Sequence, residues 1–175
     1  MDLKSKIREI PDWPKAGINF KDITTLLEDK DAFREAVDLL AAPFANEKID
    51  KIVGIDARGF LLAAPVAYKL NAGLAIVRKA GKLPSRAIKQ NYTLEYASNT
   101  IEMHDDAVRP GENIILIDDL CATGGTALAA CDLIEKLGGH ILGVGFLIDL
   151  PFLGGSKKLK ERGFEIRSLV EYTSE

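Results

Sequence analysis

Residues Ile114–Thr126 read Ile-Ile-Leu-Ile-Asp-Asp-Leu-Cys-Ala-Thr-Gly-Gly-Thr. The four aliphatic residues at its start are typical of a strand that is buried on both faces. Two acids and a glycine loop follow, and then a helical run from Ala127 to Leu137. This order leaves free backbone N–H groups at a helix N-terminus, where they can bind a phosphate. The stretch therefore predicts a phosphate site at the carboxyl edge of an α/β sheet, with Asp118 and Asp119 placed to accept sugar hydroxyls.

Hydrophobic runs on both sides of this stretch alternate between strand and helix patterns. The expected strands are 51–55, 74–77, 100–103, 114–117, 141–147 and 164–169, and the expected helices are 7–10, 32–42, 59–70 and 127–137. Such an alternation predicts a mostly parallel twisted sheet with helices on both faces. We expect one domain over residues 1–175, since the length suits a single core.

A second anion site is predicted where another buried strand ends. Asp56, Ala57, Arg58 and Gly59 follow the strand at 51–55 and open the next helix. The Arg58 guanidinium offers a fork of donors that suits phosphate oxygens. The alternative is an N-capping aspartate beside an exposed arginine. We favour the anion site because both clusters belong to the same edge of the sheet.

A basic run follows the strand at 74–77. Arg78, Lys79 and Lys82 are either a solvated face or, as we predict, cations that neutralise the second anion. From residue 79 to residue 100 the periodic pattern lapses, and the segment is polar with a glycine and a proline. A loop of this length in a compact domain is usually functional or disordered. We predict a mobile lid over residues 79–100 rather than a disordered insertion.

The composition excludes several classes of protein. The net charge of -3 argues against a nucleic-acid binder, and no apolar run is long enough to span a membrane. The N-terminus lacks the apolar core of a signal peptide, and two cysteines are too few for a disulfide framework. We therefore expect a cytoplasmic protein with reduced thiols. His104 and His140 lie far apart in the sequence, and no protein metal cage is expected.

The phosphate stretch resembles the ribose-phosphate signature of the type I phosphoribosyltransferases. The resemblance implies that Asp118 and Asp119 hold the ribose 2′- and 3′-hydroxyls. It also implies a loop that cradles the 5′-phosphate, formed by Ala122, Thr123, Gly124, Gly125 and Thr126. The segment from Asp56 to Gly59 matches the pyrophosphate loop of the same family.

Four further motifs are similar to those of the adenine phosphoribosyltransferases. They lie, in order, at residues 11–24, 58–60, 78–84 and 92–96, and the resemblance covers about residues 7–172. It implies a hood over the base within residues 1–30, with adenine bound at Asn19, Phe20 and Lys21. Many members have an apolar residue and an arginine where this chain has Asn19 and Lys21.

The resemblance also implies roles for single residues. Phe20 would stack on adenine, unless it serves only in core packing, and backbone groups near Asn19 and Lys21 would read the 6-amino group. Glu95 is expected to exchange a proton with the purine N7, and Tyr96 to close the lid. The alternative for Glu95 is a solvated lid acid. Family members usually have glycine at the position of Ala97.

The expected reaction transfers a 5-phosphoribosyl group from phosphoribosyl pyrophosphate to adenine, giving AMP and pyrophosphate. Mg2+ would arrive on the pyrophosphate and be held mainly by substrate oxygens and water. The family resemblance further implies a homodimer. Two alternatives stay open: an enzyme for another purine base, and a non-catalytic regulator that senses phosphoribosyl pyrophosphate.

Overall fold

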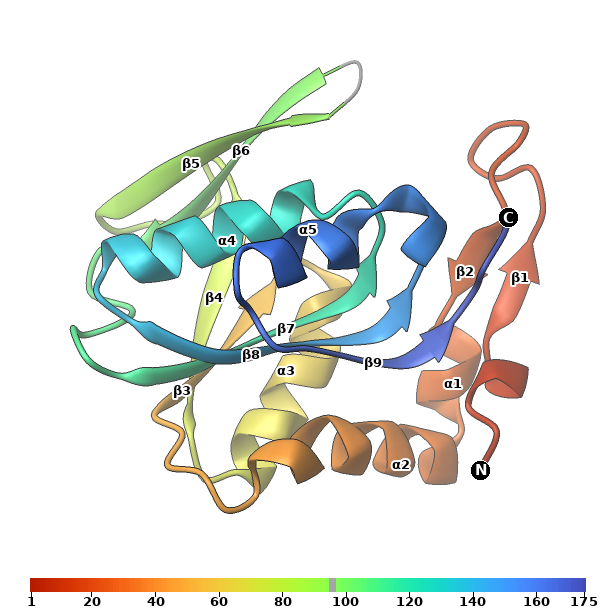
Figure 1. Cartoon of the computed structure of the whole chain (residues 1–175), viewed down its shortest axis with the longest axis horizontal. Coiled ribbons are helices and arrows are strands. Elements are labelled where there is room, and N and C mark those ends of the chain that lie inside the picture. The colour runs from red at the N-terminus through yellow and green to blue at the C-terminus, as the bar shows by residue number, and fades with distance from the viewer. Residues whose placement is uncertain (95–96) are drawn as a thin grey trace.

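The computed structural model describes residues 1–94 and 97–175. Within these residues, a seven-stranded sheet in the order β5-β6-β4-β3-β7-β8-β9 has helices on both faces (Figure 1). Its strands are β3 Lys51–Ile55, β4 Gly73–Lys79, β5 Ala87–Leu94, β6 Ala97–His104, β7 Asn113–Cys121, β8 His140–Asp149 and β9 Ile166–Glu171. A separate two-stranded sheet pairs β1 Arg8–Ile10 with β2 Phe20–Asp22.

Five α-helices and three short 3-10 helices connect the strands of the described chain. They are η1 Lys4–Lys6, α1 Thr24–Glu28, α2 Lys30–Ala41, η2 Ala42–Phe44, α3 Arg58–Lys69, α4 Gly125–Lys136, η3 Pro151–Leu153 and α5 Gly155–Glu161. Helix α2 begins where the Asp29 carboxylate accepts hydrogen bonds from the N–H groups of Asp31 and Ala32, a favourable N-cap. Over residues 1–94 and 97–175, no helix has the length and apolar character needed to cross a bilayer.

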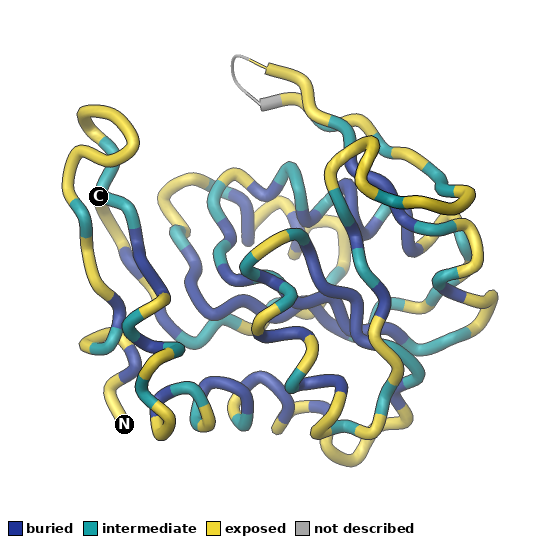
Figure 2. Tube along the Cα trace, turned by 180° about the vertical axis from the view of Figure 1, so that it is seen from behind, coloured by how far each residue is buried: buried dark blue, intermediate teal, exposed yellow. Residues whose placement is uncertain are grey.

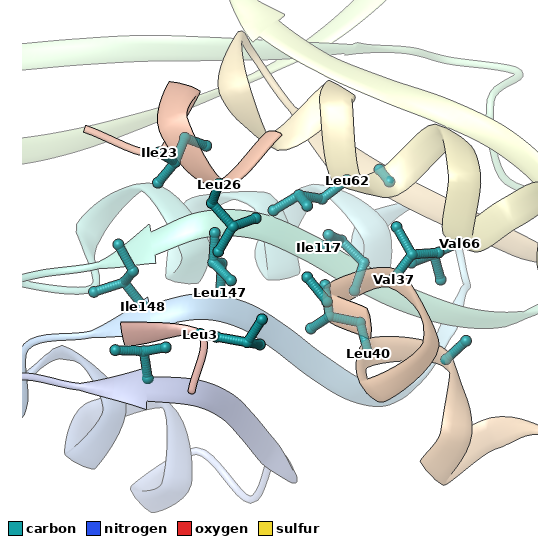
Figure 3. Close-up of a cluster of buried hydrophobic side chains, with 14 of the residues drawn as sticks. Leu3, Ile23, Leu26, Val37, Leu40, Leu62, Val66, Ile117, Leu147 and Ile148 are labelled. Atoms are coloured by element: carbon teal, nitrogen blue, oxygen red, sulfur yellow. The ribbon is translucent and has the colours of Figure 1, made fainter. Parts of the chain in front are cut away.

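The alternation of side chains along β7 builds two cores. Ile115 and Ile117 point to the face covered by α2 and α3, where Figure 3 shows Ile117 near Leu40, Leu62 and Val66. Ile114 and Leu116 of the same strand belong to the second core, beneath α4 and α5. Neighbouring side chains in a strand point to opposite faces, so a strand between two helical layers must be apolar throughout. The sheet accordingly runs through the buried centre of the molecule (Figure 2).

The predicted mostly parallel sheet is confirmed. Strands β4, β3, β7, β8 and β9 are mutually parallel. Strand β6 pairs antiparallel with β4, and β5 pairs antiparallel with β6. The connection through α3 leads from β3 to β4, whereas the connection through α4 leads from β7 to β8, on the opposite side of the sheet. The chain therefore reverses its direction of winding between β3 and β7. Ligands of open α/β sheets bind at such a point, beyond the carboxyl ends of the strands.

Two predicted elements are wrong. Residues 7–10 were expected in a helix, but Arg8–Ile10 is strand β1, because it pairs with β2 from Ile10↔Phe20 to Arg8↔Asp22. Residues 79–100 were expected to be irregular, but most of them form the β5–β6 hairpin that extends beside α4 in Figure 1. The hairpin's role as a lid stays a prediction. Glu95 and Tyr96 lie outside the described residues.

Candidate active site

The acids predicted to hold a sugar lie on a part of β7 that has lost its β3 neighbour. The last β3–β7 pair joins Gly54 to Ile117, and β7 then continues to Cys121 beside β8 alone. The strand therefore runs four residues farther than the predicted 114–117. Asp118 and Asp119 lie within this extension, at the point where the winding of the sheet reverses.

The predicted phosphate loop forms a cradle between β7 and α4. Gly124 has a φ of 85°, a left-handed conformation that favours glycine, and α4 begins at Gly125. A cavity of about 230 Å³ is lined by Asp118 and by every residue from 120 to 127. The unpaired N–H groups and positive end of a twelve-residue helix favour an anion in such a cradle.

The second predicted loop lies against the acids. Asp56 and Ala57 are joined by a cis peptide bond, and α3 begins at Arg58. A Cβ at Gly59 would lie 2.7 Å from Asp118 Oδ1, so this close approach requires glycine. Both acids and residues 55–58 line one cavity of about 270 Å³. The structure thus brings the ribose acids and the predicted pyrophosphate loop together.

Both arginines of this cavity lie beside carboxylates. Arg58 Nε lies 2.9 Å from Asp119 Oδ2, without hydrogen-bond alignment, so Asp119 Oδ2 has no hydrogen-bond partner among the described residues. Arg78 Nε donates to Asp56 Oδ2 at 3.2 Å. Burial and the neighbouring Asp119 charge raise the pKa of Asp118 well above its usual value. The Asp119 Oδ2 atom can therefore accept a hydrogen bond from a further donor.

The predicted basic run divides between cavity and solvent. Arg78 and Lys79, at the end of β4, line the cavity that contains both acids. Lys82 is exposed on the turn after β4, where its backbone N–H donates to the Lys79 carbonyl. Two of the three predicted cations therefore line this cavity, and their role beside an anion stays a prediction.

A third cavity, of about 290 Å³, is mostly apolar and lies beneath β2. It is lined by Ile18, Asn19, Phe20, Lys21, Arg58, Leu120, Ala122, Leu150, Phe152, Leu153, Ser174 and Glu175. The rings of Trp13 and Phe20 pack in a T-shaped arrangement with centroids 4.5 Å apart, and the Arg58 guanidinium carbon lies 5.0 Å from the Phe20 ring centroid. A flat apolar ring with polar edges fits these walls.

Polar groups at the margin of this apolar cavity are held in a fixed arrangement. The Lys21 side chain is only 3% exposed, and its ammonium lies 2.9 Å from Glu9 Oε2 and 4.0 Å from the Tyr172 ring centroid. The Asn19 amide nitrogen donates to the same carboxylate. Hydrogen bonds from Lys21 and then Asn19 lower the pKa of Glu9. The Asn19 Oδ1 atom is buried and has no hydrogen-bond partner in the described part of the chain.

Sequence reasoning missed part of this site. Leu120, Phe152 and Leu153 line the apolar cavity, and Tyr92 lines the cavity with the acids. Only Leu120 had a local signal, as the residue after the two acids. Cys121 is buried, and burial raises the pKa of its thiol to about 12.

Known proteins share both the sequence and this arrangement. The family model of the phosphoribosyl transferase domain matches residues 22–169. The chain is 52% identical over 172 residues to the adenine phosphoribosyltransferase of Methylobacillus flagellatus, covering 98% of each protein. It is 54% identical over 172 residues to that of Agrobacterium fabrum, covering 98% of this chain and 96% of the relative.

Solved structures agree with these relatives. The crystal structure of adenine phosphoribosyltransferase from Thermoanaerobacter pseudethanolicus has a TM-score of 0.93 and 47% identity, with 98% of each chain covered. The Saccharomyces cerevisiae enzyme, solved with adenine and an imino-altritol bisphosphate, has a TM-score of 0.87 and 36% identity over 97% of this chain and 96% of that one. By fold, site and full-length similarity, the chain belongs to the adenine phosphoribosyltransferases, within the phosphoribosyl transferase family.

Proposed function

We propose that this protein transfers the 5-phosphoribosyl group of phosphoribosyl pyrophosphate to adenine, giving AMP and pyrophosphate for purine salvage. The observation that carries the proposal is that three cavities share lining residues at one edge of the sheet, in a chain of this family. One cavity lies at the glycine loop, one lies beside residues 55–58 and the two acids, and the third is mostly apolar. Phosphoribosyl pyrophosphate needs two anion sites joined by a sugar site. Adenine needs a flat apolar site beside them.

Each substrate part has a proposed set of residues. The 5′-phosphate binds in the phosphate loop, residues 122–126, and the ribose hydroxyls bind Asp118 and Asp119. Pyrophosphate binds residues 56–59 with Arg78 and Lys79, and Lys82 is proposed to approach from the exposed turn. The Oδ2 atom of Asp119 supports the sugar assignment, because it is buried and accepts no hydrogen bond from the described residues, although Arg58 lies beside it.

Adenine is proposed to bind under β2, stacked on Phe20 and read by backbone groups of Asn19 and Lys21. The buried Asn19 Oδ1 supports selection of a 6-amino purine, since an acceptor at this margin matches the amino donor. A 6-oxo purine would leave such an acceptor unpaired, and an unpaired buried acceptor discriminates strongly against the wrong base. This is the reason to prefer adenine to hypoxanthine or guanine.

The chemistry is a displacement at the anomeric carbon. The bond from that carbon to the pyrophosphate oxygen breaks, and a bond to a ring nitrogen of adenine forms as the purine gives up a proton. Adenine is itself the nucleophile, so the protein fixes the reactants in line and stabilises the leaving anion. Arg58 and Arg78 face the position of that anion, and Glu95 is proposed to handle the purine proton through N7, with Tyr96 closing the lid.

Mg2+ is proposed to enter with phosphoribosyl pyrophosphate. When bound, it supplies positive charge that offsets the pyrophosphate charge. Among the described residues, no group of three or more His, Cys, Asp or Glu is positioned to hold a metal. The two adjacent carboxylates of Asp118 and Asp119 are hard oxygen donors, of the kind that suits Mg2+ kept largely in a substrate and water shell. The residues present therefore fit a substrate-borne ion.

A homodimer in the cytoplasm is also proposed. Helix α3 carries an exposed apolar stripe that includes Leu61, 48% exposed, and Tyr68, 91% exposed. An apolar stripe on a helix that also begins the pyrophosphate loop suits an isologous contact with a second copy. Leu61→Glu with Tyr68→Glu should shift sedimentation from dimer to monomer. The cytoplasmic assignment is supported by the two free, buried cysteines.

One assay tests the proposed function and its alternatives. The protein is incubated with phosphoribosyl pyrophosphate, Mg2+ and each purine base in turn, and nucleotide formation is followed. We expect AMP from adenine and almost no product from hypoxanthine, guanine or xanthine. Comparable rates with hypoxanthine would point to another purine enzyme. Binding of phosphoribosyl pyrophosphate without turnover of any base would point to a regulator.

A further inference from the structure

The segment Leu150–Lys158, which we call the brace, runs directly behind the phosphate loop. It leaves the end of β8, passes through η3 and enters α5, which lies beside α4 in Figure 1. The Leu150 N–H donates to the Cys121 carbonyl at 3.0 Å, and the Gly155 N–H donates to the Ala122 carbonyl at 3.0 Å. The Lys158 ammonium reaches the Thr123 carbonyl at 3.5 Å. Three consecutive carbonyls, the last of β7 and the first two of the loop, therefore have donors in the brace.

This pattern matters for an anion in the cradle. A carbonyl oxygen carries partial negative charge, so a loop that binds phosphate must turn its carbonyls away and its N–H groups inward. Loops made of small residues have no side-chain packing of their own to hold that orientation. A donor behind each carbonyl fixes the peptide planes before the phosphate arrives, which removes an ordering cost from binding.

Gly155 is the closest point of this contact. A Cβ at Gly155 would lie 2.4 Å from the Ala122 oxygen, 2.6 Å from the Gly124 nitrogen and 2.8 Å from the Thr123 carbonyl carbon. A Cβ at Gly124 would in turn lie 2.8 Å from Gly155 Cα. All these neighbours are backbone atoms, so a side chain at either position must move the loop. Gly155 does not have a positive φ, so its need for glycine comes from this contact.

We propose that Gly155 is a positioning residue for the 5′-phosphate, acting through the brace on the peptide planes of residues 121–124. The proposal rests on the assignment of the phosphate loop made above. It predicts a ligand-specific signature. Phosphoribosyl pyrophosphate and AMP both carry the 5′-phosphate and depend on the brace, whereas adenine and pyrophosphate do not.

The decisive experiment compares Gly155→Ala with Gly163→Ala in the full chain. Gly163 follows the same helix, has a φ of 90° and has no atom within 4 Å of an added Cβ, so alanine there strains the backbone without touching the loop. For Gly155→Ala we expect the KM for phosphoribosyl pyrophosphate and the inhibition constant of AMP to rise about tenfold or more, the scale of one lost charge-assisted hydrogen bond. The KM for adenine and the inhibition constant of pyrophosphate should stay within about twofold of the wild-type values.

Gly163→Ala should lower the melting temperature and leave all four constants unchanged. A purely structural role for Gly155 would behave in the same way, reducing kcat through a smaller folded fraction while the constants stay at wild-type values, and that result would overturn the proposal. If Gly155→Ala does not fold, Lys158→Met tests the same idea without added bulk. It should raise the two phosphate-dependent constants about threefold, the scale of one weak surface contact; no change would count against the brace.

Thr126→Ala separates failure of the inference from failure of the site assignment. Thr126 belongs to the phosphate loop itself and does not contact the brace in the bonds described above. If Thr126→Ala weakens AMP and Gly155→Ala does not, the loop assignment stands and the brace proposal falls. If neither variant weakens AMP, the assigned phosphate loop is wrong, and the brace proposal falls with it.

Discussion

The two strand-to-helix junctions of the site would bind anions with different parts of the chain. At the β7–α4 junction the proposed ligands are backbone N–H groups in a glycine loop, and that loop is already held from behind. At the β3–α3 junction the proposed ligands include guanidinium groups that already have carboxylate partners, Arg58 with Asp119 and Arg78 with Asp56. The proposed anion could bind at the β7–α4 junction without displacing another group. At the β3–α3 junction, Arg58 and Arg78 would first have to leave their carboxylate partners.

This difference suits the proposed reaction. The 5′-phosphate is present in both substrate and product, so a permanent cradle can hold it throughout. Pyrophosphate must leave after each turnover. Arginines that can return to Asp119 and Asp56 do not remain as unpaired cations when it goes, which reduces the cost of release. The β7–α4 junction therefore suits a phosphate that stays bound through the reaction, and the β3–α3 junction suits a pyrophosphate that must be released.

The largest expected effect comes from removing the acids between the junctions. Asp118→Asn with Asp119→Asn removes the proposed acceptors of both ribose hydroxyls, which link the two anion sites. We expect kcat/KM for phosphoribosyl pyrophosphate to fall by roughly a hundredfold or more, the scale of two lost buried hydrogen bonds to charged groups. Steady-state kinetics with varied phosphoribosyl pyrophosphate measures this. Wild-type kinetics in the double variant would contradict the sugar assignment.

If both junctions only bind anions, a residue outside them must take the proton that the purine gives up. Glu95→Gln keeps the size of the side chain but cannot carry the proton, so the chemical step should slow by roughly a hundredfold. Single-turnover formation of AMP is the right measurement, because product release can limit the steady state. Ala97→Gly, in the same hairpin, is the control and should be neutral or mildly activating. An unchanged single-turnover rate in Glu95→Gln would reduce Glu95 to a lid residue.

A smaller effect separates the two junctions directly. Arg78→Gln should weaken pyrophosphate and phosphoribosyl pyrophosphate about tenfold, as expected for one lost charged contact, and leave AMP unchanged. Arg167→Gln is a matched control, because Arg167 is an exposed arginine on strand β9, away from the site, and forms an ion pair with Glu165. Inhibition constants for AMP and pyrophosphate give the answer. Parallel weakening of both ligands would show that the junctions do not divide the anions as proposed.

The free protein should reveal the cost of keeping Asp118 in the site. Its pKa is raised in the folded state, so ionisation costs stability as pH rises above the unfolded value of 3.8. Asp118→Asn removes that cost, so the unliganded variant should be more stable than the wild type at pH 7. The gain should vanish near pH 3. Chemical denaturation at both pH values measures it, and a less stable variant at pH 7 would contradict the prediction.

The smallest signal concerns the rigidity of the backbone junction. Burial raises the pKa of Cys121 and of Cys131 to about 12, so both thiols stay protonated at pH 8. A thiol reagent such as dithionitrobenzoate should label neither in the native protein and both in denaturant. Cys131, inside α4, serves as the internal control. Selective labelling of Cys121 would show that the β7–α4 junction opens in the free protein.

Sequence predicted the backbone junction well because its determinants are local. Four apolar residues, two acids and a glycine loop before a helix specify strand, turn and helix without distant contacts. The strand's true end at Cys121 was missed because β7 keeps pairing with β8 after β3 stops. The length of a strand depends on how far its neighbouring strand continues, and the local sequence pattern does not contain that information.

The hairpin and the apolar cavity were harder to predict for the same reason. Strand β5 alternates correctly, with Ile88 and Tyr92 packed on the second core, but polar residues between them hide the pattern. Phe152 and Leu153 reach the apolar cavity from a short 3-10 helix far along the chain. Nothing near them in sequence marks them as neighbours of Phe20. The base-binding role of Phe20 was inferred from family resemblance and not from local chemistry.

The ring of Tyr172 has consequences for how the protein is made. The ammonium groups of Lys4 and Lys21 lie 4.4 and 4.0 Å from its centroid, so the early sheet of β1 and β2 is held by a residue near the end of the chain. A two-stranded sheet alone is marginal in water. During synthesis β1 and β2 leave the ribosome before Tyr172 does, so they gain this support only after the residues of both strand-to-helix junctions have been made. A nascent chain should therefore be able to form the β7–α4 loop before Tyr172 can hold β1 and β2 in place.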